Sequence, residues 1–244
     1  MRNRIAVLDV MIDVVTMKQA VATVKQFIQQ KKSSLVVTPN AEMIMMANKD
    51  RELAHIINHA DLVVPDGAGV VWAARYQGNH MPERVAGYDL VQNLLKEAAR
   101  EKYRIYFFGG LPGIAEKAKE VAEERYPGVQ IVGTRNGFFT RQEENEIVDE
   151  IKRCQPDILL AALGVPRQEK WLEQHQEELN VPAAIGVGGT FDVMAGAVQR
   201  APLWMQRYSL EWLFRLLSEP QRAIRMLALP HFVIKVITRK NNNS

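Results

Sequence analysis

The stretch DLVVPDGAGVVWAAR, at residues 61–75, contains one complete strand–turn–helix unit. Asp61–Val64 is a short apolar run typical of a buried strand, a Pro-Asp-Gly turn follows, and a helical pattern continues through Arg75. In open α/β sheets, ligands bind outside the carboxyl ends of the strands, which is where Asp66 stands in this unit. Asp66 is therefore either a turn former or helix cap, or a carboxylate with a chemical task.

The same alternation of apolar runs and helical patterns extends in both directions from this unit. Apolar runs predict further strands at Arg4–Val10, Leu35–Thr38, Tyr103–Phe108, Val129–Gly133, Asp157–Leu163 and Ala183–Val187. Helical patterns predict helices at Met17–Gln30, Ala41–His59, Tyr88–Glu101, Glu143–Cys154, Gln168–Glu178 and Phe191–Ala195, with another between Gly110 and Tyr126. Near-continuous apolar strands that alternate with helices predict an α/β fold: a Rossmann-like, largely parallel sheet with helices on both faces.

Composition places the chain among ordinary globular proteins of the reducing cytoplasm. Of its 244 residues, 47% are hydrophobic and 24% are charged. A single cysteine, Cys154, excludes a disulfide framework and any cysteine-rich metal site. Asp9 and Asp13 interrupt the apolar N-terminus, which therefore reads as a strand and not as a signal peptide. The longest apolar stretch, Ile158–Pro166, is far shorter than the ~20 residues that span a bilayer.

Charge divides the chain at about residue 200. Residues 200–244 carry eight Lys or Arg and two Glu, whereas residues 1–199 carry 23 basic and 26 acidic side chains. The basic part also contains Trp204 and Trp212, and prolines at 202, 220 and 230 divide it into about three short helices. We expect an α/β core at 1–199 and a helical appendage at 200–244 that lies in a membrane interface. Nucleic acid is the competing partner for these cations, but no recognised nucleic-acid-binding motif occurs.

Glycine turns follow several of the predicted strands. Gly109-Gly110, Gly164 and Gly188-Gly189 could present backbone N–H groups and helix N-termini to a phosphate. No GxxxxGK[ST] occurs, and no GxGxxG follows the opening strand. The five histidines show no metal-ligand spacing, and the chain has no Asp-x-Asp pair. These observations predict an anionic, nucleotide-like ligand that is bound without a metal or other cofactor, so arginines and helix dipoles would stabilise its diphosphate.

Several polar side chains at strand ends have both a structural and a functional interpretation. Thr38 and Asn40 either cap the next helix or contact substrate. Arg84 is a solvated loop charge or a phosphate ligand, and Gln168 faces water or donates to a sugar or phosphate oxygen. Asn136-Gly137 reads by itself as a turn followed by an apolar anchor.

Together, these motifs resemble the WecG/TagA/CpsF family of glycosyltransferases, and most of all its TagA branch. The motifs are VVTPNAEM (36–43), VVPDGAGVVWAAR (63–75), PERVAGYDL (82–90), FFGG (107–110), NGFF (136–139), LGVPRQEKW (163–171) and VGGTFDVMAG (187–196). The resemblance implies inverting, metal-independent transfer of N-acetylmannosamine from its UDP donor to undecaprenyl-diphosphate N-acetylglucosamine. It also implies a β-1,4 linkage that primes wall teichoic acid, and a peripheral position on the cytoplasmic face of the membrane.

The resemblance also assigns residues. It maps the family's conserved acid onto Asp66 and its Thr, Asn and Arg positions onto Thr38, Asn40 and Arg84, and these four are the expected catalytic residues. It assigns nucleotide contacts to the turns that contain Gly109, Gly110, Asn136, Gly137, Gly164, Pro166, Gln168, Gly188, Gly189, Thr190 and Asp192.

We expect a single displacement in which Asp66 deprotonates the acceptor C4 hydroxyl as that oxygen attacks C1 of the donor. Arg215, Arg222 or Arg225 would meet anionic lipid, or would fold over the site and stabilise the departing UDP. The alternatives are a transferase that uses the uronic acid donor or another UDP-sugar, and a non-catalytic nucleotide-sugar sensor. Apolar helix faces make a homodimer a further expectation.

Overall fold

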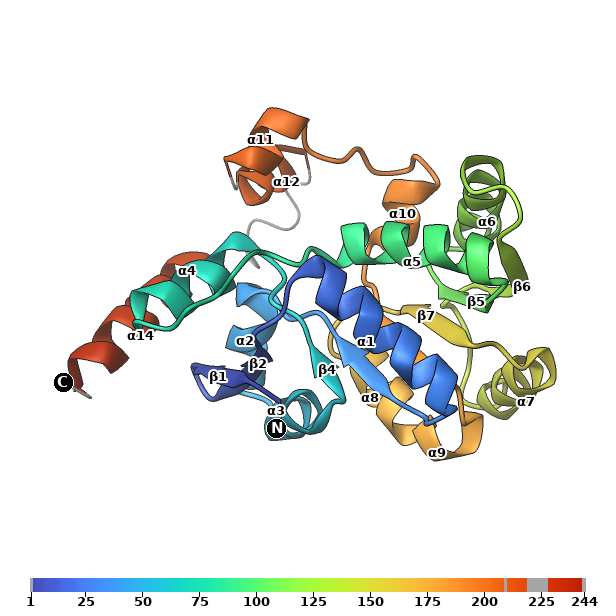
Figure 1. Cartoon of the computed structure of the whole chain (residues 1–244), viewed down its shortest axis with the longest axis horizontal. Helices are drawn as coiled ribbons and strands as arrows, with labels where there is room; N and C mark the ends of the chain where they lie inside the picture. The colour runs from blue at the N-terminus through green and yellow to red at the C-terminus, as the bar shows by residue number, and fades with distance from the viewer. Residues whose placement is uncertain (1, 209, 219–227, 243–244) are drawn as a thin grey trace.

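Six parallel strands form the centre of the molecule in the computed structural model, which describes residues 2–208, 210–218 and 228–242 (Figure 1). The strands are β3 (Leu35–Val37), β4 (Leu62–Val63), β5 (Arg104–Gly109), β6 (Gln130–Arg135), β7 (Ile158–Ala162) and β8 (Ala183–Gly186). They lie in the order β4-β3-β8-β7-β5-β6, and every neighbouring pair is parallel. All six carboxyl ends therefore meet on one side of the sheet, as the α/β prediction requires.

Helices cover both faces of this sheet and enclose two apolar cores. One face carries α2 (Ala41–Ala47), α3 (Arg51–His59), α4 (Ala68–Tyr76), α7 (Glu144–Cys154), α8 (Arg167–Gln174) and α9 (Gln176–Leu179). The other face carries α1 (Met17–Gln30), α5 (Gly87–Glu101), α6 (Ile114–Arg125) and α10 (Thr190–Met194). Leu35 and Val37 belong to the first core and Val36 to the second, because successive strand side chains point to opposite faces. The prediction of a doubly covered sheet is confirmed.

Helix boundaries follow the capping residues. Thr16 and Gln19 form the predicted capping box at the start of α1. The single helix predicted at Ala41–His59 is wrong, because the chain turns after α2 and Asp50 caps a new helix by accepting the Leu53 N–H at 3.1 Å. The helix predicted at Gln168–Glu178 is likewise divided at His175, between α8 and α9.

The predicted first strand at Arg4–Val10 is instead a hairpin that stands outside the main sheet. It consists of β1 (Arg4–Val7) and β2 (Val10–Asp13), which pair antiparallel. The turn residues Leu8 and Asp9 have φ of 48° and 71°, the left-handed backbone that a two-residue hairpin turn requires. The buried Asp13 carboxylate fastens the hairpin to the sheet, since its Oδ2 accepts the Val63 N–H at 2.7 Å.

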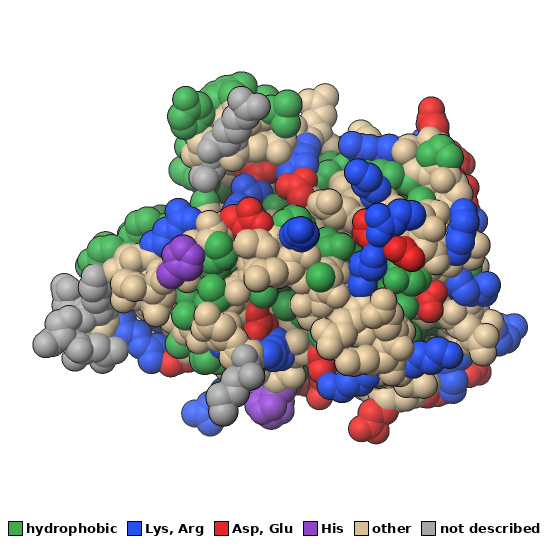
Figure 2. Space-filling view, in the orientation of Figure 1, with side chains coloured by type: hydrophobic (Ala, Val, Ile, Leu, Met, Phe, Trp, Pro, Cys, Tyr) green, Lys and Arg blue, Asp and Glu red, His purple; other side chains and the backbone are tan. Residues whose placement is uncertain are grey.

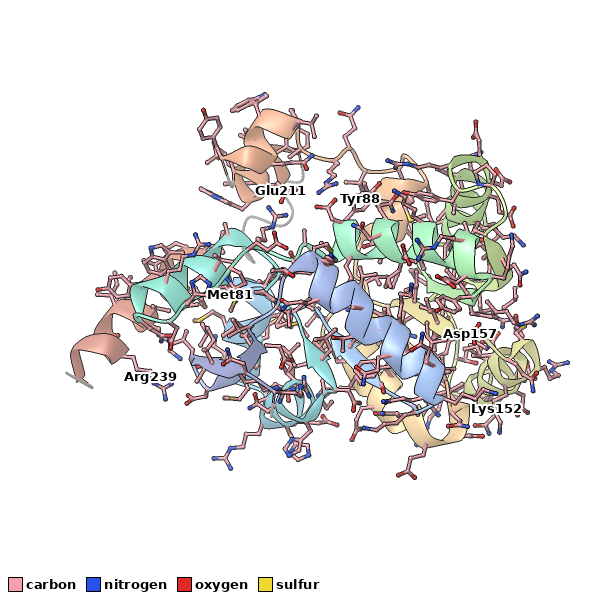
Figure 3. All side chains as sticks on the ribbon, in the orientation of Figure 1. Met81, Tyr88, Lys152, Asp157, Glu211 and Arg239 are labelled. Carbon is pink, nitrogen blue, oxygen red and sulfur yellow. The ribbon has the colours of Figure 1, made fainter. Side chains whose placement is uncertain are left out.

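The described residues of the C-terminal part contain helices, as predicted, and α14 packs against the rest of the chain. It contains α11 (Leu203–Arg207), α12 (Glu211–Ser218) and α14 (Ala228–Asn242). Phe232 and Val236 of α14 are buried in the core that α2 and α4 share, and Arg239 binds both carboxylate oxygens of Asp9 at 2.5 Å (Figure 3). Pro230 lies in the first turn of α14, where proline is tolerated, and does not divide the helix.

No helix in residues 2–208, 210–218 and 228–242 is long and apolar enough to cross a membrane. The domain boundary at residue 200 stays a prediction.

Candidate active site

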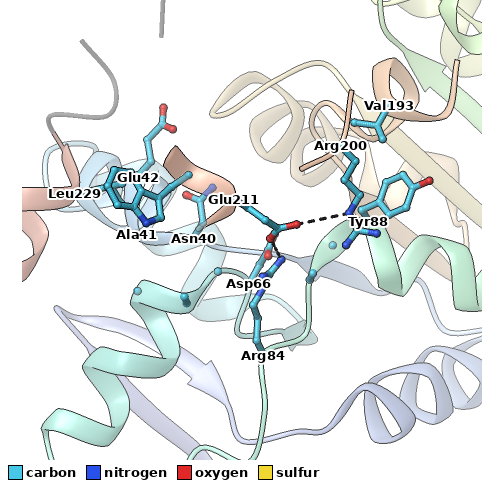
Figure 4. A pocket seen from close by; sticks show the side chains of 16 residues that line it. Asn40, Ala41, Glu42, Asp66, Arg84, Tyr88, Val193, Arg200, Glu211 and Leu229 are labelled. Carbon is cyan, nitrogen blue, oxygen red and sulfur yellow. Dashed lines mark ion pairs between the residues drawn. The ribbon is translucent and has the colours of Figure 1, made fainter. Parts of the chain in front are cut away.

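A cavity opens at the carboxyl ends of β3 and β4, between the first turns of α2, α4 and α5 and the helical tail (Figure 4). Asn40, Asp66 and Arg84, three of the four predicted catalytic residues, line it. Arg200 and Glu211 reach it from the C-terminal part of the chain. The fold therefore brings together side chains that the sequence presents in four separate segments.

Asp66 and Thr38 both approach the start of α5. A Cβ atom built on Gly87 would lie 3.4 Å from Asp66 Oδ2 and 3.3 Å from Thr38 Oγ1. Gly87 is the first residue of α5, so the positive end of a 15-residue helix dipole lies beside the Asp66 carboxylate. Gly67, and not Asp66, occupies the N-cap position of α4. The capping interpretation of Asp66 is therefore not supported, whereas its position beside a cavity fits a chemical task.

Asn40 has the structural role that its sequence context allowed. Its Oδ1 accepts the Met43 N–H at 2.9 Å and caps α2. Capping occupies only the oxygen, and the Asn40 Nδ2 donor has no hydrogen-bond partner among the described residues. Gly67 passes close to Asn40 with a φ of 85°, so a side chain at that turn would be strained. The Asn40 side chain can therefore cap α2 with its oxygen and donate into the cavity with its Nδ2.

Arg84 is not a solvated loop charge. Its Nη2 forms an ion pair with Glu211 Oε2, and its Nε is buried with no hydrogen-bond partner in the described parts of the chain. Arg200 lies on the other side of Glu211, with its Nε 3.6 Å from Oε1. Sequence reasoning counted Arg200 and Glu211 only in the charge balance of the tail and assigned neither of them to the site. No local signal marks either residue, because Arg84, which binds Glu211, and Asp89, which binds Arg200, lie more than a hundred positions earlier in the chain.

The predicted nucleotide-binding turns lie at the same side of the sheet. A Cβ on Gly109 would lie 2.3 Å from the Ala162 oxygen, so the close approach of β5 and β7 requires glycine there. The Gly137 N–H donates to the Gly110 oxygen at 2.8 Å, which joins the turns after β5 and β6. Asn136 Oδ1 accepts the Phe138 N–H at 2.9 Å, so the expected turn is present.

Gln168 connects two further turns. Its Oε1 accepts the N–H groups of Gly164, at 3.2 Å, and Gly188, at 3.1 Å. Its Nε2 donates to Glu169 Oε1 at 2.7 Å, and the whole side chain is only 2% exposed. Gln168 therefore positions the loops after β7 and β8, and the expectation that it contacts a ligand stays a prediction. Pro166, between Gly164 and Gln168 in the sequence, occupies the N-cap position of α8.

The remaining predicted nucleotide residues follow β8. Thr190 is buried, and its hydroxyl donates to the Val187 oxygen at 2.6 Å. Asp192 Oδ2 would lie 3.5 Å from a Cβ on Gly189, so the carboxylate lies beside that turn. Contact between these residues and a ligand stays a prediction.

Glu169 is a buried acid behind the same loops. It is 1% exposed, and its Oε2 has no hydrogen-bond partner among the residues that the structure describes. Burial raises the pKa of Glu169 from 4.5 to about 7, because charge is disfavoured where water is excluded. The carboxyl group is therefore largely protonated in mildly acidic solution.

Close contacts link the two groups of residues at the carboxyl ends of β3 and β8. Thr38 Oγ1 donates to the Gly186 oxygen at 3.2 Å, and a Cβ on Gly186 would lie 2.7 Å from Gln168 Nε2. The helices that follow β5 and β7, α6 and α8, pack on opposite faces of the sheet, which is the strand arrangement at which open α/β sheets bind ligands. Glycine turns at the ends of these strands and a carboxylate in an arginine-lined cavity on the same side of the sheet are typical of enzymes that act on phosphate-bearing ligands.

Comparison with known proteins gives the family. The chain belongs to the WecG/TagA/CpsF family of glycosyl transferases, whose model matches residues 5–244. It is 35% identical over 218 residues to the N-acetylglucosaminyldiphosphoundecaprenol N-acetyl-beta-D-mannosaminyltransferase of Bacillus subtilis (strain 168). The aligned residues make up 89% of this chain and 84% of that protein. It is 30% identical over 239 residues to the protein of the same name from Staphylococcus aureus (strain MW2), which covers 97% of this chain and 93% of that protein.

Two of the predicted diphosphate ligands, Arg222 and Arg225, lie outside the described residues. Arg215 lies within α12, but its side chain is not described. Within the described ranges, no group of three or more His, Cys, Asp or Glu is placed to hold a metal ion.

Proposed function

We propose that this chain transfers N-acetylmannosamine from UDP-N-acetylmannosamine to N-acetylglucosaminyldiphosphoundecaprenol, with inversion, without a metal, and with formation of a β-1,4 linkage. The observation that carries the proposal is the Asp66 carboxylate in a cavity flanked by arginines at the carboxyl ends of β3 and β4. The names of the relatives supply the donor sugar and the acceptor. The product would be the linkage unit on which wall teichoic acid is built.

In this reaction Asp66 accepts the proton of the acceptor C4 hydroxyl. The same oxygen attacks C1 of N-acetylmannosamine, the bond from C1 to the β-phosphate oxygen breaks, and UDP departs with the electron pair. A carboxylate is a weak base for a hydroxyl group, so the orientation of the two sugars supplies much of the acceleration. In this proposal Thr38 and the Asn40 Nδ2 orient the two sugars and Arg84 binds a phosphate, which their positions in or beside the cavity support.

The glycine turns would hold the nucleotide diphosphate through backbone N–H groups and helix N-termini. The turn at Gly109-Gly110 precedes α6, the one at Gly188-Gly189 precedes α10, and Gln168 fixes the position of the latter against Gly164. Such sites stabilise negative charge that grows on a leaving phosphate, which is what the departure of UDP requires.

Substitution of the proposed base tests the mechanism. Asp66→Asn keeps the shape of the side chain and removes its basicity, so we expect turnover to fall by about 100-fold or more. The assay measures UDP released from UDP-N-acetylmannosamine in the presence of lipid-linked N-acetylglucosamine. Asp149→Asn makes the same chemical change on the exposed face of α7 and should retain full activity. Turnover of Asp66→Asn close to that of the unaltered chain would remove Asp66 from this role.

The same assay separates the alternative functions. UDP release only with the uronic acid form of the donor, or only with another UDP-sugar, would correct the donor and keep the transferase. Donor binding without UDP release, with all donors and acceptors tested, would identify a nucleotide-sugar sensor instead.

The substrate also implies a membrane position, which the surface of the tail supports. Leu203, Trp204 and Tyr208 of the α11 region and Trp212 and Leu217 of α12 are all exposed, and apolar side chains gather over these helices in Figure 2. Such a face fits the headgroup region of a bilayer, with Arg215, Arg222 and Arg225 available to anionic lipid or to the departing diphosphate. Residues 200–244 would then act as the membrane-binding appendage of a core at 1–199.

A further inference from the structure

Glu211 places its carboxylate inside the proposed active cavity. It is the first residue of α12, and its two oxygens point to different arginines, Oε2 to Arg84 and Oε1 to Arg200 (Figure 4). The three side chains come from the loop before α5, the segment after α10 and the tail. An acidic group held between two guanidinium groups beside a proposed catalytic carboxylate occupies the position of a bound anion.

Arg200 is held in place independently of Glu211. Its Nη1 and Nη2 donate to the two oxygens of Asp89 at 2.7 and 2.8 Å, and its guanidinium lies 4.5 Å above the centre of the Tyr88 ring. Both partners are in the first turn of α5, so the side chain is fixed before any ligand arrives. Its Nε is the donor that faces Glu211.

Arg84 has more donor capacity than Glu211 uses. A guanidinium carries five N–H donors, and the ion pair with Glu211 involves Nη2 while the buried Nε has no partner among the described residues. A diphosphate that is substituted at both ends offers four terminal oxygens and two negative charges, two oxygens and one charge on each phosphorus, whereas a carboxylate offers two oxygens and one charge. Two converging arginines therefore match a diphosphate better than they match Glu211.

We propose that Arg84 and Arg200 form a phosphate subsite and that the Glu211 carboxylate occupies this subsite until substrate displaces it. The proposal rests on the transferase function above and adds Arg200 to the ligand-binding residues. Its chemistry fits either the diphosphate of the UDP-sugar or that of the lipid-linked acceptor. The cavity that Glu211 and Trp212 line measures about 180 Å³, below the ~300–1,000 Å³ of most small-molecule sites, and the Glu211 side chain has to leave it when a substrate enters.

In this proposal the Glu211 carboxylate competes with the substrate phosphate for the two arginines. The apparent affinity for the phosphate equals its intrinsic affinity multiplied by the fraction of molecules in which Glu211 has left the subsite. Glu211→Gln removes the charge and keeps the shape, so the KM of the substrate that uses this subsite should fall by several-fold while kcat does not decrease. Arg200→Gln removes one of the two cations, so the KM of the same substrate should rise by about tenfold.

The experiment measures kcat and both KM values for the full chain, for these two variants and for Glu146→Gln. The last variant makes the same change on the exposed face of α7 and should alter neither constant. A shift confined to UDP-N-acetylmannosamine assigns the subsite to the donor, and one confined to the lipid-linked acceptor assigns it to the acceptor. A Glu211→Gln variant with an increased KM or a reduced kcat would make Glu211 a structural or catalytic group and overturn the proposal, as would unchanged KM values in Arg200→Gln.

Calorimetric binding of inorganic pyrophosphate separates this proposal from the function on which it rests. Glu211→Gln should bind pyrophosphate more tightly than the unaltered chain, and Arg200→Gln more weakly, whichever sugar the enzyme transfers. This order of affinities would survive a failure of the proposed reaction. Equal pyrophosphate affinities in all three proteins would refute the subsite itself.

Discussion

Gly87 determines how closely two proposed catalytic side chains approach α5. A methyl group at this position would lie 3.3 Å from Thr38 Oγ1, which is a tight contact, and 3.4 Å from Asp66 Oδ2, which is ordinary van der Waals contact. Gly87→Ala should therefore displace the Thr38 hydroxyl by a few tenths of an ångström and reduce kcat/KM by several-fold. The free energy of unfolding of Gly87→Ala should hardly change, because the higher helix propensity of alanine, worth up to about 1 kcal/mol, offsets the crowding by the added methyl group.

The two measurements together test the role of Gly87. Steady-state kinetics report the displacement, and urea denaturation reports the fold. Unchanged kinetics in a stable Gly87→Ala variant would show that the space in front of α5 is not part of the site. A parallel loss of activity and stability would point to a packing role instead.

Glu169 should make stability depend on pH. In the folded chain burial raises its pKa from 4.5 to about 7, whereas the unfolded chain loses the same proton near pH 4.5. Between these pH values only the folded state keeps the proton, so the contribution of Glu169 to stability is complete below pH 4.5 and is lost as the pH rises to 7. Glu169→Gln does not titrate, and its free energy of unfolding relative to the unaltered chain should rise by about 1–3 kcal/mol between pH 5 and pH 8.

Urea denaturation at both pH values measures this difference. Glu173→Gln, an exposed position on the same helix, serves as the control and should follow the unaltered chain at each pH. A Glu169→Gln variant with the same pH dependence as the unaltered chain would mean that Glu169 is ionised throughout.

At the residue scale, the sequence located the carboxylate but not its surroundings. Asp66 and Asn40 were identifiable because each directly follows a strand, and strand ends of a parallel sheet converge. Arg200 and Glu211 follow no such rule, since their positions depend on how the tail folds back across the cavity. Gln168 looked like a ligand contact because it opens a helix, and only the packing shows that it is buried.

Among the elements, α14 has the strongest structural role in the tail. Phe232 is 1% exposed and packs into the core formed with α2 and α4. Phe232→Ala should therefore lower the free energy of unfolding by about 3 kcal/mol, measured by denaturant titration. Ile234, on the same helix but 57% exposed, provides the control, because Ile234→Ala should change stability by less than about 0.5 kcal/mol. Equal effects of the two variants would contradict the packing of α14.

Local signals explain which elements the sequence predicted. Helix α1 was predictable from its capping box, and the strands from their apolar runs. The hairpin was missed because Leu8 and Asp9 adopt left-handed backbone without the Asn-Gly or Gly-Gly pair that usually marks such a turn. The break before α3 was missed because the apolar period continues across it, and only the Asp50 cap interrupts the helix.

For the whole molecule, we expect a bilayer to cover the exposed apolar face of α11 and α12. If a bilayer covers it, Trp204→Ala combined with Leu217→Ala should weaken binding to vesicles that contain anionic phosphatidylglycerol by at least tenfold, because each large apolar side chain contributes about 1.5–3 kcal/mol when buried. Vesicle sedimentation measures this. Leu111→Ala, at an equally apolar exposed position outside the tail, should not alter binding.

The alternative occupant of this face is a second copy of the chain. In that case the protein would be a dimer without vesicles, the double variant would be a monomer, and vesicle affinity would not depend on Trp204 or Leu217. Analytical ultracentrifugation without lipid distinguishes the two outcomes.

The hairpin fastened by Asp13 has a consequence for the solubility of the protein. β4 is the outermost strand on its side of the sheet, and an outermost strand with unpaired N–H groups is a template on which other chains can add. Asp13 accepts the outward N–H of Val63, and Arg2 and Arg4 bind the same carboxylate. The N-terminal hairpin thus protects the edge strand β4 from pairing with strands of other molecules. A chain shortened from its N-terminus is expected to aggregate before it loses its active-site geometry.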